Sequence, residues 1–341
     1  MYLTQDTPVR RVYLQTSLYL LFRSFNERCQ HPVLVFHEGD FSEESITAVK
    51  EGIPGGLGSL VQFRGLDTGD FHLPASVTDD IVEANRLIVP DARGMNYRSM
   101  CRWWIRHAAR YLEPYEYYMR VDDDSFIEDI LDYDPFEAVR TAGIDYAANL
   151  LHIEHPLNAL GLLEMSTKLL DVTGRVRSLF LRGQVADTVA PNRLTAFLAR
   201  LPSHLRQCID TTSLSSPVIY YNNFHVARTG LWSHPTIAAY FKDIDCSGGI
   251  YHLRWGDAAL QTIALTATEG VSLGRFTFRY SKRYEREQGT YVNTSHPMAR
   301  RYFGAGAPLA RDRRTGSMTD FDAFNGLLAA RGLSDLIRVI A

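Results

Sequence analysis

The chain has 341 residues, of which 45% are hydrophobic and 22% charged, and its formal net charge is −3. This apolar content is sufficient for a packed core, and the length suits one large domain or two smaller ones. The charge excludes a strongly basic surface, so no nucleic-acid partner is expected. The four cysteines are too scattered for a zinc knuckle or a dense disulfide framework.

No segment is long and apolar enough to cross a bilayer, because the apolar run at residues 17–22 falls far short of the roughly 20 residues required. The N-terminus also lacks the basic region and apolar core of a secretory signal. The sequence therefore predicts no membrane segment in this chain.

The first part of the chain alternates strand-like and helix-like runs. Residues 12–15 are predicted as a first strand, residues 18–28 as a helix and residues 33–36 as a second strand, the βαβ opening of a nucleotide-binding half. Another helix is expected after the cap-like start at residues 40–46, and a third short strand at residues 61–63. This order predicts an α/β fold.

A helix is predicted over residues 94–111, and its arginines at positions 98, 102, 106 and 110 recur every four residues on one face. Such stripes are usually exposed. We therefore favour a solvated stripe that packs on acidic neighbours over a phosphate-binding role.

An acidic triplet directly follows the aromatic and apolar run at residues 117–121. This run is typical of a buried strand, whose end delivers side chains to the crevice where open α/β sheets bind ligands. Asp122 and Asp124, at i and i+2, can converge on one Mn²⁺ or Mg²⁺ ion that bridges to a substrate diphosphate. The alternative is an exposed turn or a helix cap, where aspartates are also favoured. The triplet thus indicates a nucleotide-sugar enzyme, with the turn as the simpler interpretation.

A second cluster, at residues 248–261, gathers glycine, aromatic, cationic and acidic residues and enters a helix-compatible run at residues 258–267. Asp257 is expected near the N-terminus of that helix, where unpaired N–H groups favour a carboxylate, so a helix cap is its simplest role. Arg254 and Trp255 are costly in a simple turn. They would suit a sugar or a phosphate, through charge-assisted hydrogen bonds and stacking.

The rest of the chain is less informative. Amphipathic helices are expected at residues 160–170 and 194–201, where acceptor specificity or a lid would fit. A further helix-like run covers residues 321–340.

The two clusters, with their order and context, resemble the fungal α-1,2-mannosyltransferases of glycosyltransferase family 15. Similar blocks follow in the family's order over roughly residues 10 to 290. These blocks lie at residues 31–38, 97–104, 115–124, 132–136, 223–226, 241–249 and 254–258. One block would be weak, but the ordered series is fairly specific.

The resemblance implies a GT-A type nucleotide-sugar transferase fold with a mixed central sheet flanked by helices, a Mn²⁺ ion, and transfer with retention from a donor that is GDP-mannose in the family. The family's acidic motif reads Glu-Pro-Asp. We expect Asp124 to bind the metal directly, and Asp122 to bind it or the nucleotide. The family's Arg-Trp-Gly-Asp motif is intact, so Arg254 and Asp257 are expected to contact donor or acceptor.

Two departures concern catalysis and the metal. Where the family's Asn-Phe-Glu motif has the carboxylate proposed as nucleophile, this chain has His225, which suits a general base or a substrate contact. An inverting route with Asp257 or His225 as the base therefore stays open. The metal-binding histidine of the family is absent from the equivalent residues 279–282, and His296 is the nearest substitute. Tyr221 is expected to lie near the anomeric carbon of the donor.

We expect residues 1–300 to form a single GT-A-like catalytic domain with a helical insertion at residues 156–207, and residues 301–341 to form a helical tail packed on it. Family members are typically Golgi enzymes with a membrane anchor. Without a membrane segment, this chain is expected to be a trimmed lumenal catalytic domain or a cytoplasmic protein.

The predicted function is metal-dependent transfer of mannose from GDP-mannose to a hydroxyl of a carbohydrate or glycoprotein acceptor. The alternatives are a UDP-sugar-dependent or inverting enzyme on the same fold, and a non-catalytic carbohydrate-binding relative. A sugar nucleotidyltransferase is also weighed, but the glycine-rich residues 55–58 lack the lysine that a phosphate loop would want.

Overall fold

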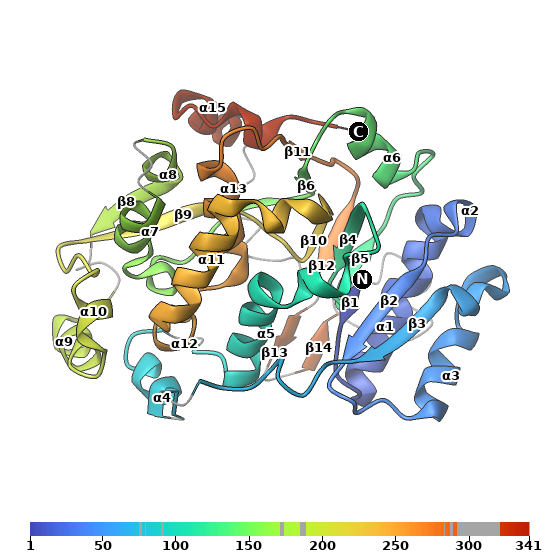
Figure 1. The fold of residues 1–341 in the computed structure, drawn as a ribbon, viewed down its shortest axis with the longest axis horizontal. Coiled ribbons are helices and arrows are strands. Elements are labelled where there is room, and N and C mark those ends of the chain that lie inside the picture. Colours follow the sequence, from blue (N-terminus) through green and yellow to red (C-terminus); the bar gives the residue numbers. More distant parts are fainter. Residues whose placement is uncertain are drawn as a thin grey trace.

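The computed structural model describes residues 1–74, 77–78, 80–89, 92–170, 174–184, 189–282, 284–286, 289–291 and 321–340. Four of its strands form a mixed central sheet, with smaller sheets around it and helices on both sides (Figure 1). No helix in this part of the chain has both the length and the apolar character needed to cross a membrane.

The N-terminal layer is a parallel sheet. The strands β1 (Tyr2–Leu3), β2 (Val33–His37) and β3 (Val61–Gly65) pair in that order. Every residue of β2 is buried, as the continuous apolar run of a parallel strand predicts. Met1 accepts a hydrogen bond from the backbone N–H of Val121, and this contact connects the layer to the next sheet.

The central strands are β11 (Leu273–Arg275), β6 (Tyr146–Ala148), β10 (Phe224–Arg228) and β4 (Tyr117–Val121), in that order. The pair β11–β6 is parallel, while β6–β10 and β10–β4 are antiparallel, so the sheet is mixed as predicted.

Shorter strands pair around this centre. The strand β5 (Ser125–Ile127) is antiparallel to β12 (Tyr280–Lys282), and β13 (Tyr284–Arg286) is antiparallel to β14 (Gly289–Tyr291). A third antiparallel group has the order β7 (Leu151–Ile153), β9 (Ser213–Tyr220), β8 (Phe180–Gln184).

The helices cover both faces of the sheet. Those of the first half are α1 (Pro8–Leu21), η1 (Phe22–Asn26), α2 (Glu27–Cys29), α3 (Glu43–Glu51), η2 (Pro54–Leu60), α4 (Asp80–Arg86), α5 (Met95–Arg106), η3 (Ala108–Tyr111), α6 (Pro135–Thr141) and η4 (Pro156–Ala159). Those of the second half are α7 (Leu162–Leu170), α8 (Arg175–Ser178), α9 (Pro191–Leu198), α10 (Ser203–Arg206), η5 (Thr229–Ser233), α11 (Pro235–Ser247), α12 (Gly249–His252), α13 (Asp257–Ala267), α15 (Phe321–Ala330) and η6 (Ser334–Ile337).

Side chains alternate between two cores along β4 and β10. Met119, Val121 and Val226 pack with α1 and β2, whereas Tyr118 and Ala227 face the larger core built with α5, α11 and α13. Figure 1 shows α11 and α13 on the opposite side of the molecule from α1 and α3. This alternation places the side chain of every second β4 residue toward α5 and α13.

The predicted first strand at residues 12–15 is wrong, because these residues lie inside α1. Pro8 opens that helix, Thr7 caps it by accepting a hydrogen bond from the N–H of Arg10, and the buried side chains of α1 recur at helical spacing. A short apolar run does not distinguish strand from helix. The actual first strand is β1, about ten residues earlier, so the βαβ order still holds.

Other predicted elements are confirmed. The second and third strands are β2 and β3, and α3 starts at a Ser42 cap whose hydroxyl accepts from the N–H of Ser45. Helix α7 lies within the predicted run at residues 160–170, and α9 overlaps the predicted run at residues 194–201 but starts three residues earlier, at Pro191. In the C-terminal run, a helix forms only over Phe321–Ala330, with the short η6 after it.

Candidate active site

A cleft of about 510 Å³ lies where β1 and β4 meet α5, α13 and the turn after β9. A volume of this size suits a small-molecule site. The cleft brings together the two predicted clusters, because it is lined by Asp122, Asp123, Asp124, Tyr221, Arg254 and Asp257.

The acidic triplet forms the turn between β4 and β5, in which the N–H of Ser125 donates to the carbonyl of Asp122 at 3.0 Å. Its middle member points toward the N-terminal layer, since Asp123 accepts hydrogen bonds from Thr4 at 2.5 Å and Arg10 at 2.7 Å. Asp122 and Asp124 instead approach one common cation. The triplet is therefore both a turn and a pair of carboxylates, Asp122 and Asp124, that converge on one cation, so the two interpretations of the sequence hold together.

That common cation is Lys282 of β12. Its Nζ lies 2.8 Å from Asp122 Oδ2 and 3.2 Å from Asp124 Oδ1. Burial would by itself raise the pKa of Asp122, but Lys282 and Arg120 outweigh it and lower that pKa to about 2. Asp122 is therefore ionised at every physiological pH. The sequence did not single out Lys282, because nothing local indicates that residues 122 and 282 are neighbours.

Arg120 joins the two predicted clusters. Its side chain is 2% exposed, its Nε lies 3.1 Å from Asp122 Oδ1, and its Nη1 lies 2.5 Å from Asp257 Oδ2. The guanidinium also lies 3.8 Å from the centre of the Trp104 ring, a cation–π contact. Burial lowers the pKa of Arg120, but Asp122 and Asp257 raise it above its ordinary value. Arg120 is absent from the site residues predicted from the sequence, although an arginine inside an otherwise apolar and aromatic strand is a signal that could have indicated a buried ionic partner.

Asp257 is the first residue of α13, as expected, while Gly256 holds the cap position. The Asp257 carboxylate does not cap the helix with its side chain. Its Oδ2 accepts from Arg120 and, at 2.8 Å, from Asn222 Nδ2. Asn222 also donates to Gln261 Oε1 at 2.8 Å, so this amide fixes the start of α13 against the turn after β9.

Arg254 and Trp255 have different roles. Arg254 lines the cleft in the left-handed backbone region, with φ of 58°, and its guanidinium lies 5.3 Å from the Tyr97 ring centre. Trp255 is 1% exposed and donates to the carbonyl of Leu160 at 2.9 Å. The hypothesis that Trp255 stacks on a sugar is therefore wrong. This ring belongs to the core and packs directly on Gly249.

His225 is fully buried behind the cleft and does not line it. Its Nδ1–H donates to the carbonyl of Asn222 at 3.1 Å, so its Nε2 accepts from the Tyr118 hydroxyl at 2.9 Å. That hydroxyl in turn accepts from Trp232 Nε1 at 2.9 Å. Burial and the charge of Arg120 keep the pKa of His225 well below its ordinary value. A neutral imidazole with both nitrogens engaged is poorly placed to act as a general base.

The arginine stripe of α5 and η3 does pack on acidic neighbours. Arg102 and Arg106 pair with Asp245, and Arg110 pairs with Asp67 and Asp70. The expectation of a solvated face is wrong for Arg98, which is buried and donates to the carbonyls of Ala92 and Tyr251. These contacts explain the stripe as a structural feature.

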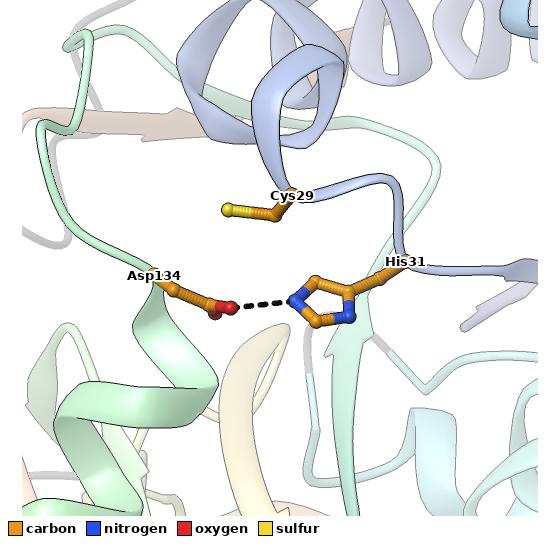
Figure 2. Close-up of side chains that lie close together, drawn as sticks. All are labelled: Cys29, His31 and Asp134. Carbon is orange, nitrogen blue, oxygen red and sulfur yellow. Dashed lines mark hydrogen bonds and ion pairs between the residues drawn. The ribbon is translucent and has the colours of Figure 1, made fainter.

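A separate cluster consists of Cys29, His31 and Asp134 (Figure 2). Within the described residues it is the only group of three Cys, His, Asp or Glu side chains close enough to share an ion. His31 Nε2 lies 2.8 Å from Asp134 Oδ2, and Asp134 Oδ1 caps α6 at Phe136 N. Burial and Asp134 raise the pKa of the Cys29 thiol, which disfavours a thiolate ligand. The cluster is explained by its role in fixing α6.

His296, the predicted substitute for the metal-binding histidine, lies outside the described residues. The described part of the site therefore offers a divalent ion two carboxylates, Asp122 and Asp124, with Lys282 between them.

Similar curated proteins are fungal mannosyltransferases. O-glycoside alpha-1,2-mannosyltransferase omh1 of Schizosaccharomyces pombe is 23% identical over 264 residues, which are 74% of this chain and 60% of that protein. Alpha-1,2 mannosyltransferase KTR1 of Saccharomyces cerevisiae is 26% identical over 183 residues, which are 52% of this chain and 40% of that protein. The chain thus spans 60% and 40% of the lengths of these two relatives.

Two solved structures have a similar fold. Core-mannan synthase A (CmsA/Ktr4) from Aspergillus fumigatus, in its Mn/GDP form, matches with a TM-score of 0.62 and 18% identity over 82% of this chain and 73% of that chain. The mannosyltransferase Ktr4p from Saccharomyces cerevisiae, in complex with GDP, matches with a TM-score of 0.65 and 16% identity over 82% of this chain and 70% of that chain. The fold is of the GT-A type, as the resemblance implied.

The family described as glycolipid 2-alpha-mannosyltransferase matches residues 2–168 and 196–271. These ranges contain the acidic triplet, the Asn222 turn and the second cluster, which the cleft brings together. The chain therefore belongs to this family, the fungal α-1,2-mannosyltransferases of glycosyltransferase family 15.

Proposed function

We propose that this chain is a glycosyltransferase that transfers mannose from GDP-mannose to a hydroxyl of a carbohydrate or glycoprotein acceptor, with retention at the anomeric carbon. The observation that carries the proposal is the Arg120 bridge, which connects the acidic triplet to Asp257 in one cleft. Relatives named as α-1,2-mannosyltransferases and the GDP complex of Ktr4p support this choice of donor.

The triplet would take the diphosphate end of the donor. Asp122 Oδ2 and Asp124 Oδ1 face one cation position, because a single ammonium contacts both, and a pair of oxygen ligands suits a hard divalent ion. Asp122 and Asp124 would thus hold Mn²⁺, or Mg²⁺, once Lys282 moves aside. When bound, the ion would offset the charge of the leaving diphosphate.

Other residues of the cleft would orient the sugar and the phosphates. Arg254 supplies a cation at the cleft wall. The ring centre of Tyr221 lies 5.7 Å from Lys282 Nζ, so this ring would lie beside the phosphates of the donor. Asp257 would hold Arg120 in place and border the acceptor side. These roles use the predicted site residues that line the cleft, and leave His225 as a buried positioning residue.

The transfer itself breaks the bond between the anomeric carbon and the β-phosphate oxygen, and the electron pair leaves with GDP. The acceptor oxygen forms the new bond to that carbon, and its proton passes to an oxygen of the departing diphosphate. This front-face route needs no protein nucleophile. His225 is buried and both of its nitrogens are hydrogen-bonded, so it is poorly placed to take a proton from the acceptor. This favours retention by the front-face route over inversion with His225 as the base.

The test is turnover of GDP-mannose with a panel of mannosides, with the new linkage assigned by NMR. Asp124→Asn should lower kcat by at least about 100-fold if this carboxylate binds the diphosphate-bound cation. Asp243→Asn, which changes an exposed aspartate of α11, is the matched control and should retain activity. If only a UDP-sugar is turned over, the proposed donor is wrong and the enzyme class stands. If a nucleotide binds but no donor is turned over, the chain is a binding protein.

A further inference from the structure

One feature of the cleft differs from a simple two-carboxylate metal site: a lysine already occupies the position between the carboxylates. Lys282 Nζ contacts Asp122 at 2.8 Å and Asp124 at 3.2 Å. We propose that Lys282 is a built-in cation of the donor site, which holds the nucleoside diphosphate when no divalent ion is bound. This inference rests on the proposed function, because it concerns the same donor.

The position of Lys282 is set by sheet pairing. Strand β12 is antiparallel to β5, and Lys282 lies directly opposite Ser125, the residue that follows the triplet. Tyr280, two residues earlier, donates from its hydroxyl to Ser125 Oγ at 2.7 Å. Ser281, on the other face of the strand, donates from its hydroxyl to Glu128 Oε1 at 2.7 Å. The backbone therefore directs the lysine at the triplet, and the contact is not one geometry among many for an exposed side chain.

Burial makes this ammonium an integral part of the site. The Lys282 side chain is 17% exposed, and those of Asp122 and Asp124 are 23% and 15% exposed. An ammonium in such a place is costly unless it is paired and hydrogen-bonded. Asp122 and Asp124 meet this requirement, since both carboxylates lie beside the ammonium.

The ammonium can still bind a phosphate. An –NH₃⁺ group has three N–H donors; one of them donates to Asp122 at 2.8 Å, and the Asp124 carboxylate lies 3.2 Å from Nζ as an ion pair. Because Lys282 also lines the cleft, a further N–H of the ammonium can reach a phosphate oxygen placed there. Asp122 and Asp124 would then orient the lysine instead of a metal.

The lysine and a divalent ion exclude each other from this position. Manganese-like ions bind carboxylate oxygens at roughly 2.0–2.2 Å, inside the space that Nζ occupies. An ion must therefore displace Lys282 and break both of its charge-assisted contacts. Lys282 should consequently weaken metal binding and, at the same time, make nucleotide binding independent of the metal.

The first experiment measures GDP binding by calorimetry, with EDTA and with Mn²⁺. For the unchanged protein we expect dissociation constants that agree within about threefold. Lys282→Met should weaken binding in EDTA by about tenfold or more, and Mn²⁺ should restore it. Lys282→Arg should keep metal-independent binding, and Lys242→Met, which removes an exposed lysine of α11, should leave both values unchanged.

The second experiment measures Mn²⁺ binding by EPR without nucleotide. Lys282→Met should bind Mn²⁺ at least about tenfold more tightly than the unchanged protein, because the competing ammonium is gone. A gain in affinity cannot result from misfolding.

The outcomes separate this inference from the proposed function. If the unchanged protein binds GDP only with Mn²⁺, or if Lys282→Met binds Mn²⁺ no more tightly, the inference is overturned and the function stands. If GDP binds under neither condition, both are overturned.

Discussion

Among single substitutions at the cleft, we expect replacement of Arg120 to lower the free energy of unfolding most. The substitution Arg120→Met leaves a side chain of similar length but removes the cation between Asp122 and Asp257. Asp122 keeps its ion pair with Lys282, but Asp257 loses its 2.5 Å ion pair with Arg120 and keeps the neutral hydrogen bond from Asn222. Breaking a buried ion pair by removing one partner typically costs about 3–5 kcal/mol.

Thermal and urea unfolding of Arg120→Met measure this cost. A loss of this size should lower the melting temperature by roughly 4–7 °C, since an unfolding entropy of about 2.1 cal/mol/K per residue corresponds to about 1.4 °C per kcal/mol for a chain of 341 residues. The melting temperature of Arg120→Lys should lie between those of Arg120→Met and the unchanged protein. The lysine keeps a positive charge, but a single ammonium cannot reproduce the guanidinium fork that contacts both carboxylates.

A double-mutant cycle separates the uncompensated charge from lost packing. Asp257→Asn keeps an acceptor for Asn222 but removes the charge that Arg120→Met leaves behind, so the double variant should regain at least about 1 kcal/mol. A loss below about 1 kcal/mol for Arg120→Met, or no recovery in the double variant, would refute the bridge as an energetic link.

Two further predictions concern the core behind the cleft. His225 stays neutral when folded, whereas its unfolded pKa is about 6.5, so the unfolded state binds more protons and stability should fall as pH drops below about 6.5. Urea unfolding between pH 7 and pH 5 should therefore show a pH slope that is smaller by up to about 1.4 kcal/mol per pH unit in His225→Gln, and an equal slope in both proteins would contradict the buried neutral imidazole. Gly249→Ala should cost about 1–3 kcal/mol or more, because its Cβ would lie 2.1 Å from the Trp255 ring, whereas Gly230→Ala, with nothing within 4 Å, should be nearly neutral by the same assay. Equal stability of the two alanine variants would show that Trp255 moves aside without cost.

The sequence predicts the local parts of the site well, because each depends on a short stretch of chain. The run at Tyr117–Val121 is a buried strand, and Asp257 opens a helix, as their patterns indicate. Asp122 and Asp124 converge on one cation as the i and i+2 spacing requires. The exception is the first strand, where the apolar run inside α1 has no local feature that excludes a strand.

Contacts between distant segments are harder to predict. Arg120 meets Asp257 only because the fold brings the end of β4 to the first residue of α13, and His225 is buried only because β10 lies between β4 and β6. Sheet order and register determine these contacts, and one sequence contains no direct record of either. Trp255 shows the same difficulty, since its motif suggested a ligand while its burial shows a core residue.

Lys282 shows how the place of a functional group can be predicted while its role is not. Spacing from Asp257 identified residues 279–282 as the segment that should bring a metal-binding histidine to the site, and this segment is part of the strand β12 that pairs beside the triplet. The residue that reaches Asp122 and Asp124 is a lysine, which carries the same sign of charge as the metal. A neutral imidazole at that position would help to bind a divalent ion, whereas an ammonium competes with it. A single change of residue type therefore reverses the effect on metal affinity while leaving a positive charge for the diphosphate, so a relative with histidine here should depend on the metal more strongly than this chain.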